Sequence, residues 1–301
     1  MNLLTIGLPE LLAKEAQSAW QHILESAGDT LADRLTGALA VGPEAQQLAR
    51  VLACSPFVAD LLRRKPELLL DLVVSGQLQQ SLPDAEFRDV LHHSVSGDGA
   101  ELSPRLRQYR ARHMLRIVWR DFCRLADTLE TMRDTSLLAE AAIAEAVTIS
   151  QAELESRHGV PIGRDSGDAQ QLIVLAMGKL GARELNVSSD IDLIFVYPQG
   201  GQTNGKKHPV SNEEFFTKVG RAVISALDQV TAEGFVFRVD MRLRPYGESG
   251  ALVHSFAALE DYYQHQGRDW ERYAMIKARP VTGNPQQAAA LAALLLAAMV
   301  G

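Results

Sequence analysis

Three aspartates have the type and spacing that metal-dependent phosphoryl chemistry requires. Asp190 and Asp192 lie two residues apart in an apolar run that ends at Tyr197, so they share one face of a predicted strand. Asp240 lies in a second alternating segment, residues 235–244. If the two strands are neighbours, three carboxylates meet, and such hard oxygen ligands suit Mg²⁺. Two ions held in this way stabilise the entering and leaving oxygens of an in-line displacement at phosphorus.

A glycine and several cationic side chains accompany the acids. Gly178 follows a buried apolar run and precedes Lys179, and its missing side chain lets a phosphate approach backbone N–H groups. Arg242 and Arg244 lie two and four positions beyond Asp240, so strand alternation predicts that they share its face. We expect these cations to neutralise charge on phosphate oxygens. A solvated polar face is the competing interpretation, but the combination of features favours a phosphate site.

Helices are predicted to position the acids from the N-terminal side. Residues 1 to about 160 show helical periodicity, most clearly after Pro104, where an apolar stripe extends to Leu129. A second long helix is predicted over residues 137–157, which are rich in Ala, Leu and Glu. Residues 158–169 contain Pro and several glycines and are predicted to form a linker.

Beyond the linker the pattern changes to short strands. Strands are predicted over residues 171–177, 190–197 and 235–244. A helix between the second and third strands begins at Ser211, which forms an S-x-x-E capping box with Glu214. The fold class is therefore α+β. The expected domains are a helical region over 1–165, an α/β core over 166–255 and the start of a further helical region over 256–301.

Composition excludes several classes of protein. The chain has 301 residues, of which 47% are hydrophobic and 22% charged, as is typical of a globular protein with a substantial core. The net charge of −7 disfavours nucleic acid as a partner. Cys54 and Cys123 lack metal-ligand spacing and suit a reducing compartment. No signal peptide or membrane span is evident, so we expect a cytoplasmic protein without a membrane partner.

Two other groups of residues have open roles. Arg112, Arg116, Arg120 and Arg124 recur every four residues and form a basic ridge on one predicted helix. The ridge contacts either an anionic partner or, as we favour, acids of its own chain. Further along the chain, we expect Trp270 and Tyr273 to pack in the core, Tyr262 and Tyr263 to pack between helices, and Lys277 and Arg279 to be surface cations.

Three long segments resemble a known family. The segment Met177–Phe195 resembles the polymerase-beta-type nucleotidyltransferase signature, and the segments 237–253 and 261–279 are similar to the same proteins. The resemblance is specifically to the bifunctional enzymes that adenylylate and deadenylylate glutamine synthetase. It is strong from about Leu172 to Arg279. The resemblance implies a small polymerase-beta-like nucleotidyltransferase core with flanking helices.

The resemblance also implies an activity. Residues 184–190 and 242–250 look like the N-terminal, adenylyl-removing version of the enzyme. That version removes AMP from a tyrosine of glutamine synthetase with phosphate as the nucleophile, and it releases ADP. The implied partners are adenylylated glutamine synthetase, phosphate, ADP or ATP, and the PII signalling protein. The implied cofactor is Mg²⁺.

Site residues follow from the same resemblance, position by position. Asp190, Asp192 and Asp240 match the metal ligands, whereas Gly178 and Ser189 match residues that line the nucleotide phosphates. We interpret the three aspartates as the catalytic residues of a phosphorolytic nucleotidyltransferase.

Members of this family are longer than the present chain. They continue through further helices and a second transferase domain, so we expect the chain to be the N-terminal part of a longer protein. The apolar residues Ala288–Val300 are then a helix whose partners lie further along the polypeptide. Two alternatives stay open: adenylyl transfer from ATP to glutamine synthetase, and a catalytically incomplete chain that only binds glutamine synthetase.

Overall fold

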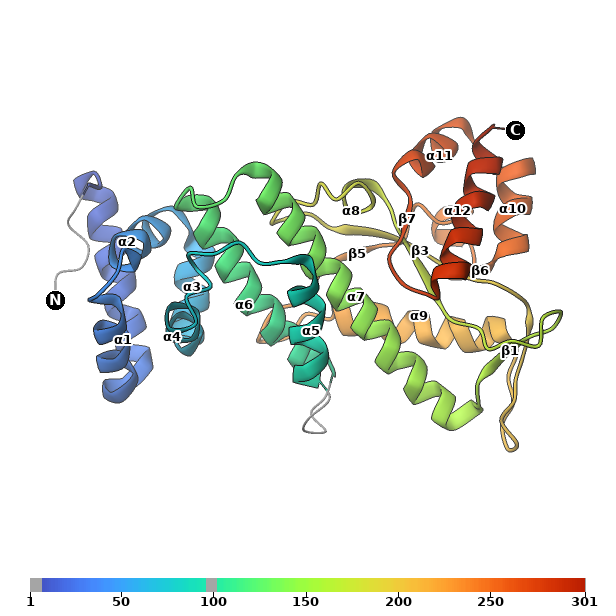
Figure 1. Ribbon diagram of the computed structural model, residues 1–301, viewed down its shortest axis with the longest axis horizontal. Coiled ribbons are helices and arrows are strands. Elements are labelled where there is room, and N and C mark those ends of the chain that lie inside the picture. The colour runs from blue at the N-terminus through green and yellow to red at the C-terminus, as the bar shows by residue number, and fades with distance from the viewer. Residues whose placement is uncertain (1–6, 96–101, 301) are drawn as a thin grey trace. The chain divides into compact units, whose positions relative to one another are not determined.

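The computed structural model describes residues 7–95 and 102–300 and has an α+β fold, as the sequence predicts (Figure 1). By contact density the chain divides into two compact units. The first contains the described part of Met1–Glu86 together with Gln108–Thr135, and the second contains the described parts of Phe87–Arg107 and Ser136–Gly301. These units cross the expected boundary at residue 165, because most of one long helix belongs to the second unit. The predicted domain ranges themselves stay a prediction.

The first unit is built from helices. They are α1 (Glu10–Leu39), α2 (Glu44–Cys54), α3 (Pro56–Arg64), α4 (Glu67–Val74), the beginnings of α5 (Asp84–Val95) and α7 (Thr128–His158), and most of α6 (Leu102–Phe122). α3 begins sharply because the Ser55 side chain accepts a hydrogen bond from the Val58 N–H and Pro56 occupies the first helical position. α6 ends earlier than the predicted apolar stripe, and Leu129 is exposed.

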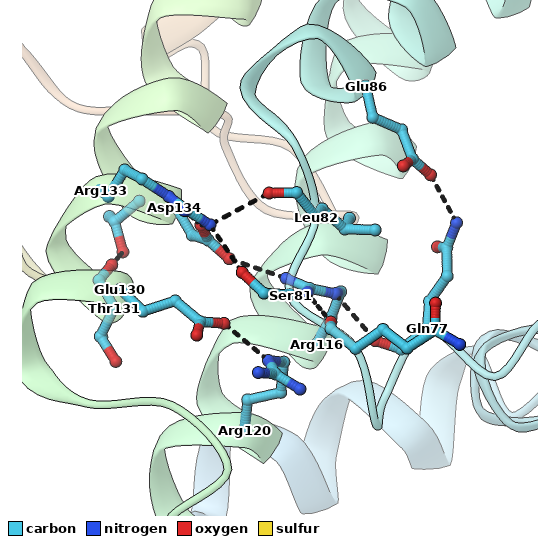
Figure 2. Close-up of polar contacts among 12 residues, drawn as sticks. Gln77, Ser81, Leu82, Glu86, Arg116, Arg120, Glu130, Thr131, Arg133 and Asp134 are labelled. Carbon is cyan, nitrogen blue, oxygen red and sulfur yellow. Dashed lines mark hydrogen bonds and ion pairs between the residues drawn. The ribbon is translucent and has the colours of Figure 1, made fainter.

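Two arginines of the ridge are buried and bind the chain itself (Figure 2). The Arg116 guanidinium lies 2.8 Å from the Asp134 carboxylate and donates to the carbonyl oxygens of Gln77 and Gln80. Every N–H direction of a guanidinium needs a partner when the group is buried, and carbonyls and carboxylates supply them here. The cluster therefore fixes the segment after α4 against α6 and α7.

Arg112 and Arg120, on either side of Arg116 on this ridge, are paired as well, whereas Arg124 lies beyond the end of α6. Arg120 donates to Glu130 at 2.8 Å (Figure 2). It also donates to the Leu78 carbonyl at 3.0 Å. Arg112 lies 2.6 Å from Asp71. The interpretation of the ridge as an internally paired, structural surface is confirmed for these positions.

A mixed sheet forms the centre of the second unit. Its strands are β2 (Ile173–Ala176), β3 (Ile191–Tyr197), β5 (Val239–Asp240), β6 (Val253–Ser255) and β7 (Arg279–Pro280). The order is β5-β3-β2-β7, and β6 also pairs with β3. β3 runs antiparallel to β2 but parallel to both β5 and β6. A separate antiparallel pair joins β1 (Pro161–Gly163) to β4 (Gly201–Thr203).

Helices cover both faces of this sheet because its apolar residues point to both sides. On one face Phe195 packs so closely on α9 (Asn212–Asp228) that a Cβ on Gly220 would lie 2.9 Å from its ring. On the other face Leu175 and Ile194 join a core with residues of α10 (Phe256–His265) and α12 (Pro285–Val300). α9 begins where predicted, since the Ser211 hydroxyl accepts from the Glu214 N–H.

The remaining elements are short. α8 (Gly178–Gly181) follows β2, and α11 (Asp269–Ala274) follows α10. Two 3-10 helices, η1 (Gly247–Ser249) and η2 (Met275–Lys277), complete the connections. Within residues 7–95 and 102–300, no helix combines the length and apolar character that crossing a bilayer requires.

One strand is much shorter than the sequence predicts. Alternation predicts a single strand over residues 235–244, but β5 contains only Val239 and Asp240. The chain turns immediately afterwards, and Tyr246 adopts a left-handed conformation with φ of 61°. Alternation therefore does not extend to Arg242 and Arg244, and tertiary contacts decide where those arginines lie.

Candidate active site

Strand pairing brings the three predicted acids to one cavity. β3 and β5 are parallel neighbours, and their register places Asp192 directly opposite Asp240. Adjacent strands lie about 4.8 Å apart, so the two side chains share one face at close range. Asp190 precedes β3 by one residue and lines the same cavity of about 480 Å³. Asp240 therefore lies beside Asp192, as the sequence-based hypothesis requires.

Two of the three carboxylates are paired with arginines. Arg238 Nε lies 2.5 Å from Asp190 Oδ1. The Arg242 guanidinium contacts both carboxylate oxygens of Asp240, and the Arg242 N–H donates to Asp240 Oδ1 at 2.8 Å. This arginine lowers the pKa of Asp240 below its ordinary value. The side chain of Arg242 is 73% exposed, so it is free to move toward an anion that enters the cavity.

The negative charge of Asp192 is only partly balanced by neighbouring cations. Burial raises its pKa, and the charges of Asp240 and Asp190 raise it further, while Arg242 and Lys179 oppose these effects. Three acids in one cavity repel one another, and a cation that bound among them would relieve this repulsion. Asp192 is therefore the side chain whose charge most favours a bound cation.

Gly178 permits the close approach of the turn to Asp192. Its φ is 51°, and an added Cβ would lie 2.7 Å from Asp192 Oδ2. The sequence suggests one reason for a glycine, which is access of phosphate to the backbone. The structure adds a second reason, because any larger residue would push this carboxylate away.

The predicted phosphate-binding residues of the α8 turn also line the cavity. Lys179 Nζ donates to the Ser189 hydroxyl at 3.3 Å, and that hydroxyl donates to Asn186 Oδ1 at 2.7 Å. Asn186 also accepts from the Ser188 N–H and so holds the loop before β3. The exposed ammonium of Lys179 thus lies beside the acids and is available to an anion.

Arg279 fixes the α8 turn from behind. Its guanidinium donates to the carbonyl oxygens of Gly181 at 3.0 Å and Leu180 at 3.1 Å, and it lies 2.6 Å from Glu140 Oε1. Glu140 comes from α7 and is 2% exposed. A Cβ on Gly181 would lie 1.9 Å from the Lys277 carbonyl oxygen, so the chain passes directly against the turn. The prediction that Arg279 is an ordinary surface cation is wrong.

Arg244 is not brought to the cavity. Because β5 stops at Asp240, the guanidinium of Arg244 turns back and donates to the carbonyl oxygens of Met241 at 2.8 Å and Glu248 at 3.0 Å. It closes the loop that carries Arg242. In the structure Arg244 shapes this loop, and its contact with phosphate stays a prediction.

Some residues of the cavity are absent from the sequence-based prediction. Asn186, Ser188 and Arg238 line it but are not among the predicted site residues. A signal for Asn186 is present in the sequence, since an Asn side chain in a loop commonly accepts a hydrogen bond from the backbone two residues further on. Arg238 is visible there as a member of the polar face of the third predicted strand. Its partner, Asp190, is identified only by the pairing of β5 with β3.

The donor set fits a hard divalent cation. Carboxylate oxygens are the ligands that Mg²⁺ prefers, and three of them face one cavity beside cationic side chains. In the conformation described, no group of three or more His, Cys, Asp or Glu residues within 7–95 and 102–300 converges closely enough to hold a metal. In this conformation Arg238 and Arg242 pair with two of the three carboxylates.

Comparison with known proteins decides the family. The family model for glutamate-ammonia ligase adenylyltransferase matches residues 45–293, which is well over half of the chain. The chain belongs to the glutamate-ammonia ligase adenylyltransferase family.

Curated members of this family are close relatives. A bifunctional glutamine synthetase adenylyltransferase/adenylyl-removing enzyme of Pseudomonas aeruginosa is 50% identical over 293 residues, which cover 96% of this chain and 30% of the relative. The protein of the same name from Pseudomonas syringae pv. tomato is 53% identical over 84% of this chain and 26% of its own length. A third, from Hahella chejuensis, is 48% identical over 92% of this chain and 28% of its own length.

This member of the glutamate-ammonia ligase adenylyltransferase family therefore spans less than a third of the length of these relatives. The match includes both strands that carry the acids and the turn that carries Gly178, since all lie within residues 45–293. The cavity described above is thus part of the segment that defines the family.

Proposed function

We propose that this chain catalyses phosphorolysis of adenylyl-tyrosine on glutamine synthetase, with release of ADP. The register of Asp192 and Asp240 on parallel neighbouring strands carries the proposal, because these two acids and Asp190 line one cavity together with cationic side chains. The names of the relatives include both adenylyl transfer and adenylyl removal. The resemblance of residues 184–190 and 242–250 to the adenylyl-removing version supports the second activity.

The proposed reaction is a displacement at the phosphorus of the adenylyl group. An oxygen of inorganic phosphate forms the new bond to phosphorus, and the bond to the tyrosine oxygen breaks. The tyrosine oxygen leaves with the electron pair and takes up the proton that the attacking hydrogen phosphate loses, and the AMP unit becomes part of ADP. No oxidant, reductant or further reactant is needed.

Residues of the cavity supply the environment for this displacement. We propose that Asp190, Asp192 and Asp240 hold Mg²⁺, which when bound stabilises negative charge on the entering and leaving oxygens. Lys179, with Ser189 and Gly178 beside it, would orient a phosphate group on the side of the α8 turn. Arg242, which is exposed, would balance the charge of the incoming phosphate.

The test uses adenylylated glutamine synthetase, Mg²⁺ and inorganic phosphate. We expect ADP, rather than AMP, to be released. Asp190→Asn and Asp192→Asn should each lower the rate by at least about a hundredfold, because each removes a proposed metal ligand. The matched control is Asp165→Asn, which changes an exposed acid outside the cavity and should leave the rate unchanged. Undiminished ADP release by Asp190→Asn or Asp192→Asn would contradict the assigned site.

The same materials separate the alternatives. If labelled ATP modifies unadenylylated glutamine synthetase while no ADP is released in the first assay, the chain carries the reverse activity. Binding to glutamine synthetase without either reaction would show a recognition module. Addition of PII to the first assay tests the regulator that the family resemblance implies.

A further inference from the structure

A second pocket adjoins the acidic cavity. It has a volume of about 410 Å³ and is formed by the loop after β5 together with α10 and α11. Three aromatic residues line it, and two of them, Tyr246 and Trp270, are 58% and 52% exposed, whereas Tyr262 is buried. The prediction that Trp270 packs in the core is therefore wrong. Burying a ring is favourable, so two half-exposed rings in one concavity mark a binding surface.

Arg242 connects the two pockets. Its side chain lines both the acidic cavity and the aromatic pocket, and it is the residue common to the two. A molecule whose phosphate lies beside Asp192 and Lys179 can therefore extend past Arg242 to the aromatic rings. Such a molecule has an anionic group at one end and a flat, largely uncharged group at the other.

The walls of the aromatic pocket are fixed in advance. Tyr246 has a left-handed φ of 61° and makes an edge contact with Tyr262 at 4.6 Å between ring centroids. The Tyr262 hydroxyl donates to the buried carboxylate of Glu271 at 2.7 Å, and that carboxylate also accepts from the Arg268 N–H at 2.8 Å. Strain in the backbone at Tyr246 is typical of a residue held for function.

We propose that the pocket lined by Tyr246 and Trp270 binds the adenosine part of the adenylyl group. The proposal rests on the proposed function and assigns the position of its nucleoside. A purine offers a broad face for stacking on aromatic rings. The polar ends of Gln266 and Ser249, which also line the pocket, are suited to hydrogen bonds with the base and ribose. The tyrosine part of the substrate then extends from another side of the cavity.

Trp270 provides a direct signal for this test. The chain has three tryptophans, and Trp20 and Trp119 are 2% and 0% exposed. Quenching of tryptophan fluorescence by iodide therefore reports mainly on Trp270. In the presence of Mg²⁺, we expect ADP to protect this fluorescence from iodide, whereas pyrophosphate, which lacks the nucleoside, should not.

Affinity measurements by calorimetry give a second readout. The wild-type chain should bind ADP about tenfold or more tightly than pyrophosphate, and Trp270→Ala or Tyr246→Ala should each remove most of that difference. Their affinity for pyrophosphate should not change. The matched control is Tyr273→Ala, since Tyr273 is 75% exposed on the same helix as Trp270 and does not line the pocket. Circular dichroism checks that each variant is folded.

Each outcome bears on a different statement. Loss of the ADP preference in Trp270→Ala and Tyr246→Ala supports the adenosine pocket. Unchanged ADP affinity in both folded variants overturns the pocket while leaving the proposed function intact. Protection of Trp270 by a phosphotyrosine peptide but not by ADP also overturns it, because the pocket then holds the tyrosine arm. Failure of the wild-type chain to bind ADP at all would overturn the proposed function as well.

Discussion

Asp192 holds an unfavourable charge at the centre of the acidic cavity. Its pKa is raised, first by burial and then by Asp240 and Asp190. Gly178 leaves it no room to withdraw, since the turn passes against its carboxylate. Residues that oppose folding in this way are characteristic of functional sites, where the cost is recovered when a ligand binds. For Asp192, a bound divalent cation would offset the unfavourable electrostatic free energy of its charge.

Asp192→Asn should therefore stabilise the chain at neutral pH while it removes activity. A carboxyl whose folded pKa is raised favours folding when protonated, and this contribution is lost as pH rises through the folded pKa. The variant should gain under about 1 kcal/mol at pH 7, because the group is only half-buried, and the gain should shrink as pH falls toward 3.8. Thermal unfolding measured across this pH range tests the prediction.

The addition of Mg²⁺ tests the same charge argument in a second way. The ion should raise the melting temperature of the wild-type chain and of Asp165→Asn, because binding to the folded state alone stabilises it. It should have little effect on Asp192→Asn. A stability difference that does not vary with pH, or an equal response of the variant to Mg²⁺, would count against the charge argument.

The α8 turn depends on contacts from elements far along the chain. A four-residue helix has too few internal hydrogen bonds to hold itself, so its geometry is imposed from outside. Arg279 ties its last carbonyls to Glu140 on α7, and Lys277 pairs with Glu184 just beyond the turn at 2.7 Å. The turn that presents Gly178 and Lys179 is therefore positioned by α7, by Lys277 and by Arg279 of β7.

Arg279→Lys should loosen this turn without unfolding the chain. Lysine keeps the charge opposite Glu140, but an ammonium cannot reproduce the planar fork that also reaches the carbonyls of Leu180 and Gly181. We expect KM for phosphate to rise by about tenfold, with a smaller change in kcat, because ground-state positioning of phosphate is what the turn provides. Steady-state kinetics of ADP release measure both.

Arg183→Lys is the matched control for that substitution. Arg183 contacts the same carboxylate at 3.3 Å, but its side chain is 45% exposed, and the turn carbonyls of Leu180 and Gly181 receive their side-chain hydrogen bonds from Arg279 instead. The substitution should leave KM within about twofold of wild type. An equal rise of KM in both variants would mean that the hydrogen bonds from Arg279 to the turn carbonyls are not what positions phosphate, and Arg279 would then lose its positioning role.

At the scale of the whole molecule, the chain separates two tasks between two compact units. Every residue that lines the acidic cavity and the aromatic pocket belongs to the second unit. The first unit uses its buried charge to hold its own segments together, through Arg116, Arg120 and Asp134. A fully buried guanidinium is costly unless every partner is present, so these residues determine stability rather than chemistry.

Arg116→Met should lower the stability of the chain by about 3–5 kcal/mol, because it leaves buried carbonyls without donors and removes a partner of Asp134. Arg112→Met is the control on the same ridge. Its pair with Asp71 is partly exposed, so the expected loss is under about 1 kcal/mol. Urea denaturation followed by circular dichroism measures both losses of stability. Similar losses in the two variants would contradict the claim that the buried contacts of Arg116 stabilise the fold more than the partly exposed pair of Arg112.

The amino-acid sequence by itself determined the local features. The helical character of the N-terminal region, the strands β2 and β3 and the cap at Ser211 all follow from periodicity and side-chain chemistry, whereas β1, β4, β6 and β7 were not predicted. These features depend on interactions within a few residues, which the sequence displays directly. The long motifs around the acids likewise indicate the family through the order of their residues alone.

Tertiary structure alone decided how distant segments meet. The register that sets Asp192 opposite Asp240, the early end of β5 that turns Arg244 away, and the exposure of Trp270 each result from contacts between segments far apart in the chain. Strand register and burial are set by the packing of the whole sheet and its helices, and no local pattern encodes that balance. The acids were therefore predictable as residues, whereas their meeting in one cavity was decided by the fold.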